Sequence, residues 1–265
     1  MGRFIVILLL GVITLSAKAD VAVLVHGYLG SAASWERSGV NAELAQQGWP
    51  LAGVFTSRGL IALPGVASKN TIYTIELPSI EPVARQADIL RGMLGVVDRR
   101  HPGEPVILIG HSTGGVVARM ALVQGGMPQV KALVTIASPH LGTVRAVEAL
   151  DKTDDSFPIS WMKEFFIGDI YSVVRDSWGV LLDLTPEQPG NLLFWLNRQP
   201  HPDIRYFSVI RPGPVGMGDE LVPAFSQDMN NVSVLRGKSG VRLTPVTHTL
   251  HSMDGKLLAE ILATL

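Results

Sequence analysis

The sequence predicts one α/β domain in which a mainly parallel β-sheet is covered by helices. Short runs of branched apolar residues alternate with longer stretches of helical periodicity, which is typical of strand–helix–strand units. Several strand-like runs are apolar throughout, as expected for strands buried on both faces. The chain of 265 residues fits one large domain, and 47% hydrophobic residues can fill its core.

The N-terminal part of the domain begins with a buried strand at residues 21–25 (VAVLV). Residues 34–47 can form a helix, which Gly48 and the following Trp-Pro pair would end. Branched and aromatic residues predict further strands at 54–56 and 71–76. Residues 59–70 between these strands are expected to form a loop.

The middle of the chain alternates helix and strand most clearly. Apolar residues recur at helical intervals over residues 81–100, which predicts an amphipathic helix. Residues 105–110 (PVILIG) form the most convincing core strand, and residues 116–123 continue as a helix that glycines end. Residues 131–137 are expected to form the next strand.

The alternation stops between residues 144 and 202 and then resumes. Strands are expected at 204–210 and 241–246, and a closing helix at 253–265. The interrupted region predicts a mostly helical insertion over the sheet. Its aromatic residues could form a lid over an acyl pocket, or they could be the core of an ordinary cap. They are Phe157, Trp161, Phe165, Phe166, Tyr171, Trp178, Phe194 and Trp195.

The first 19 residues have the pattern of a secretory signal peptide, which leaves residues 20–265 as the mature domain. Arg3 gives a positive start, residues 4–15 are almost all apolar, and Ala17 and Ala19 fit a cleavage site before Asp20. The apolar run is short for a transmembrane helix, although an uncleaved anchor is the alternative. The protein is therefore expected to be exported to a periplasm or the medium.

Composition excludes several classes of function. The formal net charge is −1 and no basic stripe is present, so nothing indicates a nucleic-acid partner. The chain has no cysteine, which excludes disulfides, thiolate metal sites and a cysteine nucleophile. Asp151, Asp154 and Asp155 could suggest a cation site, but a solvated loop is the preferred interpretation. No metal or other cofactor is expected, and the oligomeric state is left open.

Residues 110–114 (GHSTG) match the G-x-S-x-G pattern and lie between the strongest strand and a helix. A serine on so tight a strand-to-helix turn exposes its hydroxyl, and small residues two positions away avoid backbone clashes. The pattern predicts Ser112 as a nucleophile; the alternative is a glycine-rich turn with an inert serine. His111 is expected to be structural.

Acyl transfer needs backbone N–H donors aimed at the oxygen that becomes negative. The N–H of Thr113, directly after the nucleophile, is one candidate. Residues 26–30 (HGYLG) follow the first strand, and the N–H of Tyr28 is the second candidate. The alternative is a simple turn that ends the strand, and His26 is expected to hold the loop.

Three segments resemble the signature segments of bacterial lipases and related α/β-hydrolase esterases. They are residues 26–30, residues 110–115 (GHSTGG) and residues 138–143 (SPHLGT), in the same order as in that family. The resemblance covers most of the mature chain but is weak in the insertion. It implies the α/β-hydrolase fold, and a structural role is expected for His140.

The family order of serine, acid and histidine places the remaining two groups late in the chain. The resemblance favours Asp219 as the acid, because its D-x-x-V-P context is similar to the acid loop of lipases; Glu220 and Asp228 are rivals. His248 is nearest the end of the last strand and is the preferred base. His251 remains an alternative.

The sequence thus predicts an exported, lipase-like serine hydrolase that cleaves carboxylic esters through an acyl-enzyme. An ester or lipid is the expected substrate, with transient contact to a lipid interface. Acyltransferase or thioesterase chemistry with the same residues is an alternative. A non-catalytic binding module on this fold is another.

Overall fold

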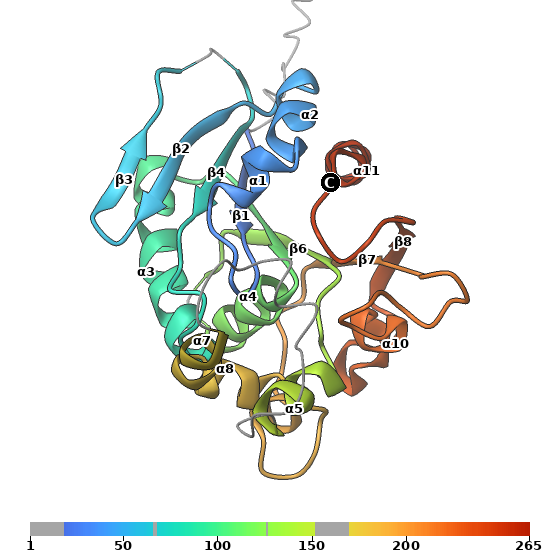
Figure 1. Ribbon diagram of the computed structural model, residues 1–265. Helices are drawn as coiled ribbons and strands as arrows, with labels where there is room; N and C mark the ends of the chain where they lie inside the picture. The colour runs from blue at the N-terminus through green and yellow to red at the C-terminus, as the bar shows by residue number, and fades with distance from the viewer. Residues whose placement is uncertain (1–18, 66–67, 126, 152–169) are drawn as a thin grey trace, which may run out of the picture.

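The computed structural model describes residues 19–65, 68–125, 127–151 and 170–265 of the chain. Its centre is an eight-stranded sheet in the order β3-β2-β4-β1-β5-β6-β7-β8, which Figure 1 shows from the β3 edge to the β8 edge. All neighbours pair in parallel except β2 and β3. The strands are β1 (Val21–Val25), β2 (Leu51–Thr56), β3 (Gly59–Ala62), β4 (Thr71–Ile75), β5 (Val106–His111), β6 (Val130–Ile136), β7 (Arg205–Ile210) and β8 (Ser239–Leu243).

The helices complete a three-layer arrangement of the kind that the parallel sheet requires. They are α1 (Ser34–Arg37), α2 (Val40–Gln46), α3 (Val83–Arg100), α4 (Thr113–Val123), α5 (Val144–Asp151), α7 (Ile170–Asp176), α8 (Trp178–Asp183), α9 (Leu192–Leu196), α10 (Ala224–Gln227) and α11 (Ser252–Leu262). Short 3₁₀ turns lie at Met229–Asn231 and Ser233–Leu235.

The two faces of the sheet carry separate apolar clusters. Val21, Val23 and Val25 of β1 pack with the apolar faces of α3 and α4. Ala22 and Leu24 point the other way and pack with residues of α2 and α11. All five residues of β1 are fully buried, which explains why this strand is apolar at every position.

The predicted α/β architecture is confirmed, and several elements are corrected. The strand expected at 54–56 begins at Leu51, and the closing helix expected to reach 265 ends at Leu262. The helix expected at 34–47 is two helices, because Gly39 adopts a left-handed φ of 81° between them. Part of the expected loop at 59–70 is strand β3, which forms a hairpin with β2. Helix α4 begins at Thr113 rather than at 116, and β8 ends at Leu243 instead of continuing to 246.

The described part of the insertion at 144–202 contains α5, α7, α8 and α9. Trp178 and Trp195 are 47% and 44% exposed. Four aromatic residues of the predicted lid lie outside the described residues: Phe157, Trp161, Phe165 and Phe166. The same holds for Asp154, Asp155 and nearly all of the predicted signal peptide. Within the described ranges, no helix is long and apolar enough to cross a membrane.

Candidate active site

The predicted site residues lie beyond the carboxyl ends of the sheet strands. Tyr28 follows β1, Ser112 follows β5, Asp219 follows β7 and His248 follows β8. In an open parallel sheet these ends meet at one edge, which is where ligands of α/β proteins bind. Segments more than 100 residues apart in the sequence therefore meet at one place.

The turn at Ser112 is strained and closely packed. Ser112 has φ 52° and ψ −128°, a left-handed conformation that is costly for a residue with a Cβ atom. A Cβ atom on Gly110 would lie 2.5 Å from the backbone of Gly115, and one on Gly114 would lie 2.4 Å from the carbonyl oxygen of His26. Only glycine fits at these two positions, so the sequence pattern follows from the geometry of the turn.

Ser112, His248 and Asp219 form one chain of hydrogen bonds. The Ser112 Oγ lies 2.8 Å from Nε2 of His248, and the His248 Nδ1 lies 3.0 Å from Oδ2 of Asp219. The His248 and Asp219 side chains are only 5% and 1% exposed. An ionised Asp219 holds the proton on Nδ1, which leaves the lone pair of Nε2 facing the serine hydroxyl.

Asp219 is held as a carboxylate by several donors. Its Oδ1 accepts hydrogen bonds from the amides of Leu221 and Val222 at 2.8 and 2.7 Å. Burial by itself raises the pKa of Asp219, but the hydrogen bond from His248, the charge of that ring and the two amides together lower it below 3.8. Asp219 is therefore ionised at neutral pH.

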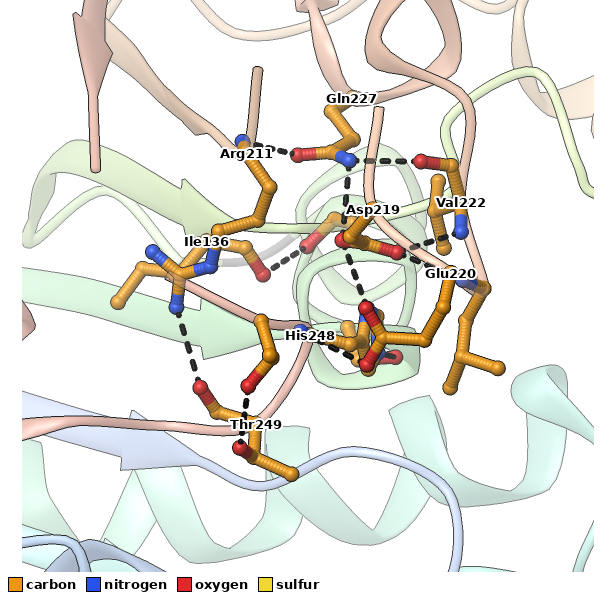
Figure 2. A network of polar contacts seen from close by, with 12 residues as sticks. Ile136, Arg211, Asp219, Glu220, Val222, Gln227, His248 and Thr249 are labelled. Atoms are coloured by element: carbon orange, nitrogen blue, oxygen red, sulfur yellow. Dashed lines mark hydrogen bonds and ion pairs between the residues drawn. The ribbon is translucent and has the colours of Figure 1, made fainter. Parts of the chain in front are cut away.

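Gln227 connects Asp219 to the end of β7. Its Nε2 donates to Asp219 Oδ2 at 3.1 Å and to the Val222 carbonyl at 2.8 Å, while its Oε1 accepts the amide of Arg211 at 2.7 Å. Figure 2 shows Gln227 between Arg211 and Asp219, with His248 beyond the carboxylate. Gln227 is only 1% exposed, so its side-chain amide fixes the Asp219 carboxylate through buried hydrogen bonds.

The backbone of His248 is held on both sides. The Glu220 carboxylate accepts its N–H at 3.1 Å, and the Nε2–H of His111 donates to its carbonyl at 2.9 Å. Burial, followed by the nearby His248 ring, lowers the pKa of His111 to about 3, so His111 is neutral. His111 thus orients the imidazole without adding charge.

Two of the rival residues have other roles. His251 caps α11: its Nδ1 accepts the amide of Met253, and the carboxylate of Asp254 accepts the amide of His251. Asp228 accepts the amide of Asn230 and caps a 3₁₀ turn. The structure therefore brings His248 rather than His251 to Ser112, and Asp219 rather than Asp228 to His248.

The backbone amides of Tyr28 and Thr113 are the predicted donors for a substrate oxygen. Thr113 is the first residue of α4, whose N–H groups point out of the helix end. Neither amide donates a hydrogen bond to an acceptor among the described residues. Tyr28, Ser112 and Thr113 line the same small cavity of about 50 Å³. This arrangement offers two donors beside the serine.

The two other histidines of the signature segments are structural. The Nδ1–H of His26 donates to the Gly27 carbonyl and its Nε2 accepts the amide of Leu77, which fixes the loop after β1. His140 is fully buried; its Nε2–H donates to Thr135, and its Nδ1 accepts from Arg119. Both rings are outside the chain of hydrogen bonds that ends at Ser112.

Sequence reasoning missed Gln227 and considered Glu220 only as a rival acid, because the contacts of both exist only in the fold. His111 was expected to be structural, and it contacts the His248 carbonyl. Arg211, directly after the apolar run of β7, could have been noticed as a charge at a strand end. No group of three or more residues suited to a metal ion occurs among the described residues.

A curated relative shares part of the sequence. The chain is 38% identical over 64 residues to a lysosomal thioesterase PPT2 homolog of Drosophila melanogaster. This match covers 24% of the chain and 22% of the length of that relative.

Two solved structures resemble nearly the whole chain. A lipase of Bacillus licheniformis in its mature form is 17% identical, with a TM-score of 0.63 and coverage of 94% of this chain and 92% of the lipase. The product of gene lin2722 from Listeria innocua is 15% identical, with a TM-score of 0.60 and coverage of 94% and 95%. The model of the alpha/beta hydrolase family matches residues 22–261. The chain belongs to the α/β-hydrolase family.

Proposed function

We propose that the protein is a serine hydrolase that cleaves carboxylic esters through an acyl-enzyme. The observation that carries the proposal is the hydrogen-bonded chain of Ser112, His248 and Asp219, with 2.8 Å between the hydroxyl and the imidazole. A neutral imidazole at this distance can accept the serine proton as the oxygen attacks a carbonyl carbon. Ser112 would be the nucleophile, His248 the base and Asp219 the acid.

The reaction would proceed in two halves. Ser112 Oγ bonds to the ester carbonyl carbon while His248 takes its proton, and the amides of Tyr28 and Thr113 stabilise the negative oxygen. The C–O bond to the alcohol then breaks, and His248 returns the proton to the leaving oxygen. Water repeats the sequence on the acyl-enzyme and releases the acid, which restores the serine.

The test compares Ser112→Ala with the native protein on p-nitrophenyl butyrate. We expect the variant to lose at least about a thousandfold in kcat while its circular dichroism spectrum stays unchanged. His248→Ala should show a similar loss, and His251→Ala should retain nearly full activity because its ring caps α11. Normal turnover by Ser112→Ala would refute the assignment.

A thioester substrate is the second candidate, because the 64-residue match is to a thioesterase homolog. The same nucleophile and donors could cleave either bond, since both expose a carbonyl carbon to attack. Matched butyryl esters and thioesters, assayed side by side, would separate the two. Adding a competing alcohol and analysing the products would reveal acyltransferase activity.

Lipid contact is a further part of the proposal. Trp178 and Leu182 of α8 are 47% and 50% exposed, and α8 also contributes Leu181 to the small cavity beside Ser112. Exposed apolar side chains next to a reaction site favour transient contact with a lipid interface. A rise in rate as an ester exceeds its solubility limit would support this, and a smooth saturation curve would contradict it.

We also propose that the protein is exported with cleavage after Ala19. The positive start and apolar run of residues 1–15 support this proposal. The intact mass of protein recovered from the periplasm or medium of a bacterial host should correspond to a chain that begins at Asp20. A mass that retains Met1 would contradict cleavage.

A further inference from the structure

Ser112 adjoins two cavities of different character that described residues line. The smaller, about 50 Å³, has a wall of Ala146, Leu181, Leu184 and Val222. The larger, about 390 Å³, lies between the loop after β1, the helix α1 and the loop that carries His248. Ser34, Arg37 and Ser38 of the α1 region line the larger cavity. The smaller cavity is also lined by a charged residue, Arg145, but that guanidinium is already paired with the Glu148 carboxylate and donates to the Glu220 carbonyl.

Arg37 lines the larger cavity without an acidic partner. Its Nη2 makes only long contacts to the hydroxyls of Ser31 and Ser34, at 3.5 and 3.4 Å. The neighbouring Glu36 carboxylate accepts from Asn41 instead. Arg37 forms no ion pair with any acidic side chain in the described ranges. The guanidinium therefore keeps donors for a ligand.

Among the described residues that line the larger cavity, Arg37 is the only permanently charged one. His111 is neutral, because burial holds its pKa near 3. Asp219 is screened from the cavity behind His248 and is 1% exposed at its side chain. The cavity therefore carries an uncompensated positive charge, which favours an anionic ligand.

We propose that Arg37, with the hydroxyl of Ser34, binds an anionic group on the leaving half of the substrate. This inference rests on the proposed function, because it assigns the two halves of an ester to two sides of Ser112. A planar guanidinium can donate two parallel hydrogen bonds to a carboxylate or phosphate, and the Ser34 hydroxyl can donate one more. The substrate class is thus a carboxylic ester whose alcohol carries a carboxylate or a phosphate.

The leaving half is assigned to the larger cavity because its charged group needs the unpaired guanidinium of Arg37. Hydrocarbon gains by entering the smaller cavity, whose charged lining residue, Arg145, is already paired with Glu148. His248 lines both cavities, so it can return its proton to a leaving oxygen on the side of Arg37. The acyl chain would therefore occupy the side of Leu181 and Leu184.

The test uses aryl butyrates that differ only in the para group of the alcohol. The anionic substrates are 4-butyryloxybenzoate and 4-butyryloxyphenyl phosphate, and the neutral partner is 4-butyryloxybenzamide. Values of kcat/KM are measured for the native protein and for Arg37→Gln at low ionic strength. Arg58→Gln is the matched control, because it removes the same charge at the turn between β2 and β3.

We expect Arg37→Gln to lower the anionic-to-neutral ratio of kcat/KM about fivefold, mainly through KM, as the loss of one solvent-accessible ion pair predicts. Arg58→Gln should leave the ratio unchanged. Added salt should reduce the preference of the native protein, because it screens the guanidinium. Comparing kcat/KM for the carboxylate and phosphate substrates shows which anion the site prefers.

A ratio unchanged by Arg37→Gln would overturn the inference while ester hydrolysis, and thus the proposed function, remained. Phenyl hemisuccinate carries its charge in the acyl half. If Arg37→Gln lost activity on this substrate alone, the assignment of the two halves to the two cavities would be overturned. Binding of the product 4-hydroxybenzoate, followed by NMR titration, needs no turnover. Suppose that the native protein binds 4-hydroxybenzoate more tightly than Arg37→Gln does, but hydrolyses no ester. This result would support the anion site and reject the proposed function.

Discussion

The buried ion pair between Arg211 and Asp254 links the end of β7 to the start of α11. Both side chains are 0% exposed, and the guanidinium donates to the two carboxylate oxygens at 2.6 and 2.7 Å. Asp254 also accepts the amide of His251, and Arg211 donates to the carbonyl of Thr249. The pair therefore fixes both ends of the short segment that follows His248.

Asp254→Asn should lower the free energy of unfolding by about 3 to 5 kcal/mol, because it leaves the Arg211 guanidinium buried and uncompensated. The asparagine NH₂ group would also face a guanidinium N–H, so one of the two short bonds becomes a contact between donors. The double variant Arg211→Met with Asp254→Leu removes both charges and should recover most of this loss.

Urea unfolding, followed by tryptophan fluorescence, measures these differences. The matched control is Asp88→Asn, which breaks the exposed pair of Asp88 with Arg91 and should cost less than about 1 kcal/mol. If Asp254→Asn costs no more than Asp88→Asn, the reasoning about the buried pair is wrong. A double variant less stable than Asp254→Asn would also contradict it.

Three further variants test the surroundings of the site. Gln227→Ala should lower kcat about tenfold with KM nearly unchanged, because Asp219 loses a buried donor; steady-state kinetics on p-nitrophenyl butyrate would measure it. His251→Ala should cost about 1 kcal/mol of stability in urea, as expected for a lost helix cap, with hydrolysis preserved. The folded-state pKa of Asp219 lies below 3.8, so its contribution to stability is complete above that pH and falls as the pH drops through the folded value. The stability difference between the native protein and Asp219→Asn should therefore be smaller at about pH 2 than at about pH 6.

The sequence predicted those parts of the fold that local pattern determines. The apolar runs of β1, β5 and β6 are buried on both faces, so composition alone indicates them. Strand β3 was missed because its residues are mostly exposed and it exists only through pairing with β2. Strand β8 was misplaced because it is an edge strand whose Val241 and Leu243 are 37% and 59% exposed.

In the candidate site too, the sequence predicted the local features but not the contacts that the tertiary fold creates. Glycine spacing predicted the turn at Ser112, since steric exclusion acts within a few residues. The choice between His248 and His251 depends on which ring faces the serine. The two residues are only three positions apart, and their side chains point in different directions. Arg211 stands out in the sequence as a charge at a strand end, but its contacts and those of Gln227 could not be identified, because only the tertiary fold brings their partners together.

Reaction with a fluorophosphonate tests most directly whether Ser112, His248 and Asp219 act as one nucleophilic unit. The reagent bonds covalently to a serine only if a neighbouring base activates it. Peptide mass spectrometry should locate the adduct on Ser112 in the native protein and in His251→Ala, and labelling of His248→Ala should be slower by orders of magnitude. Absence of the adduct from the native protein, or equal labelling of His248→Ala, would contradict the account.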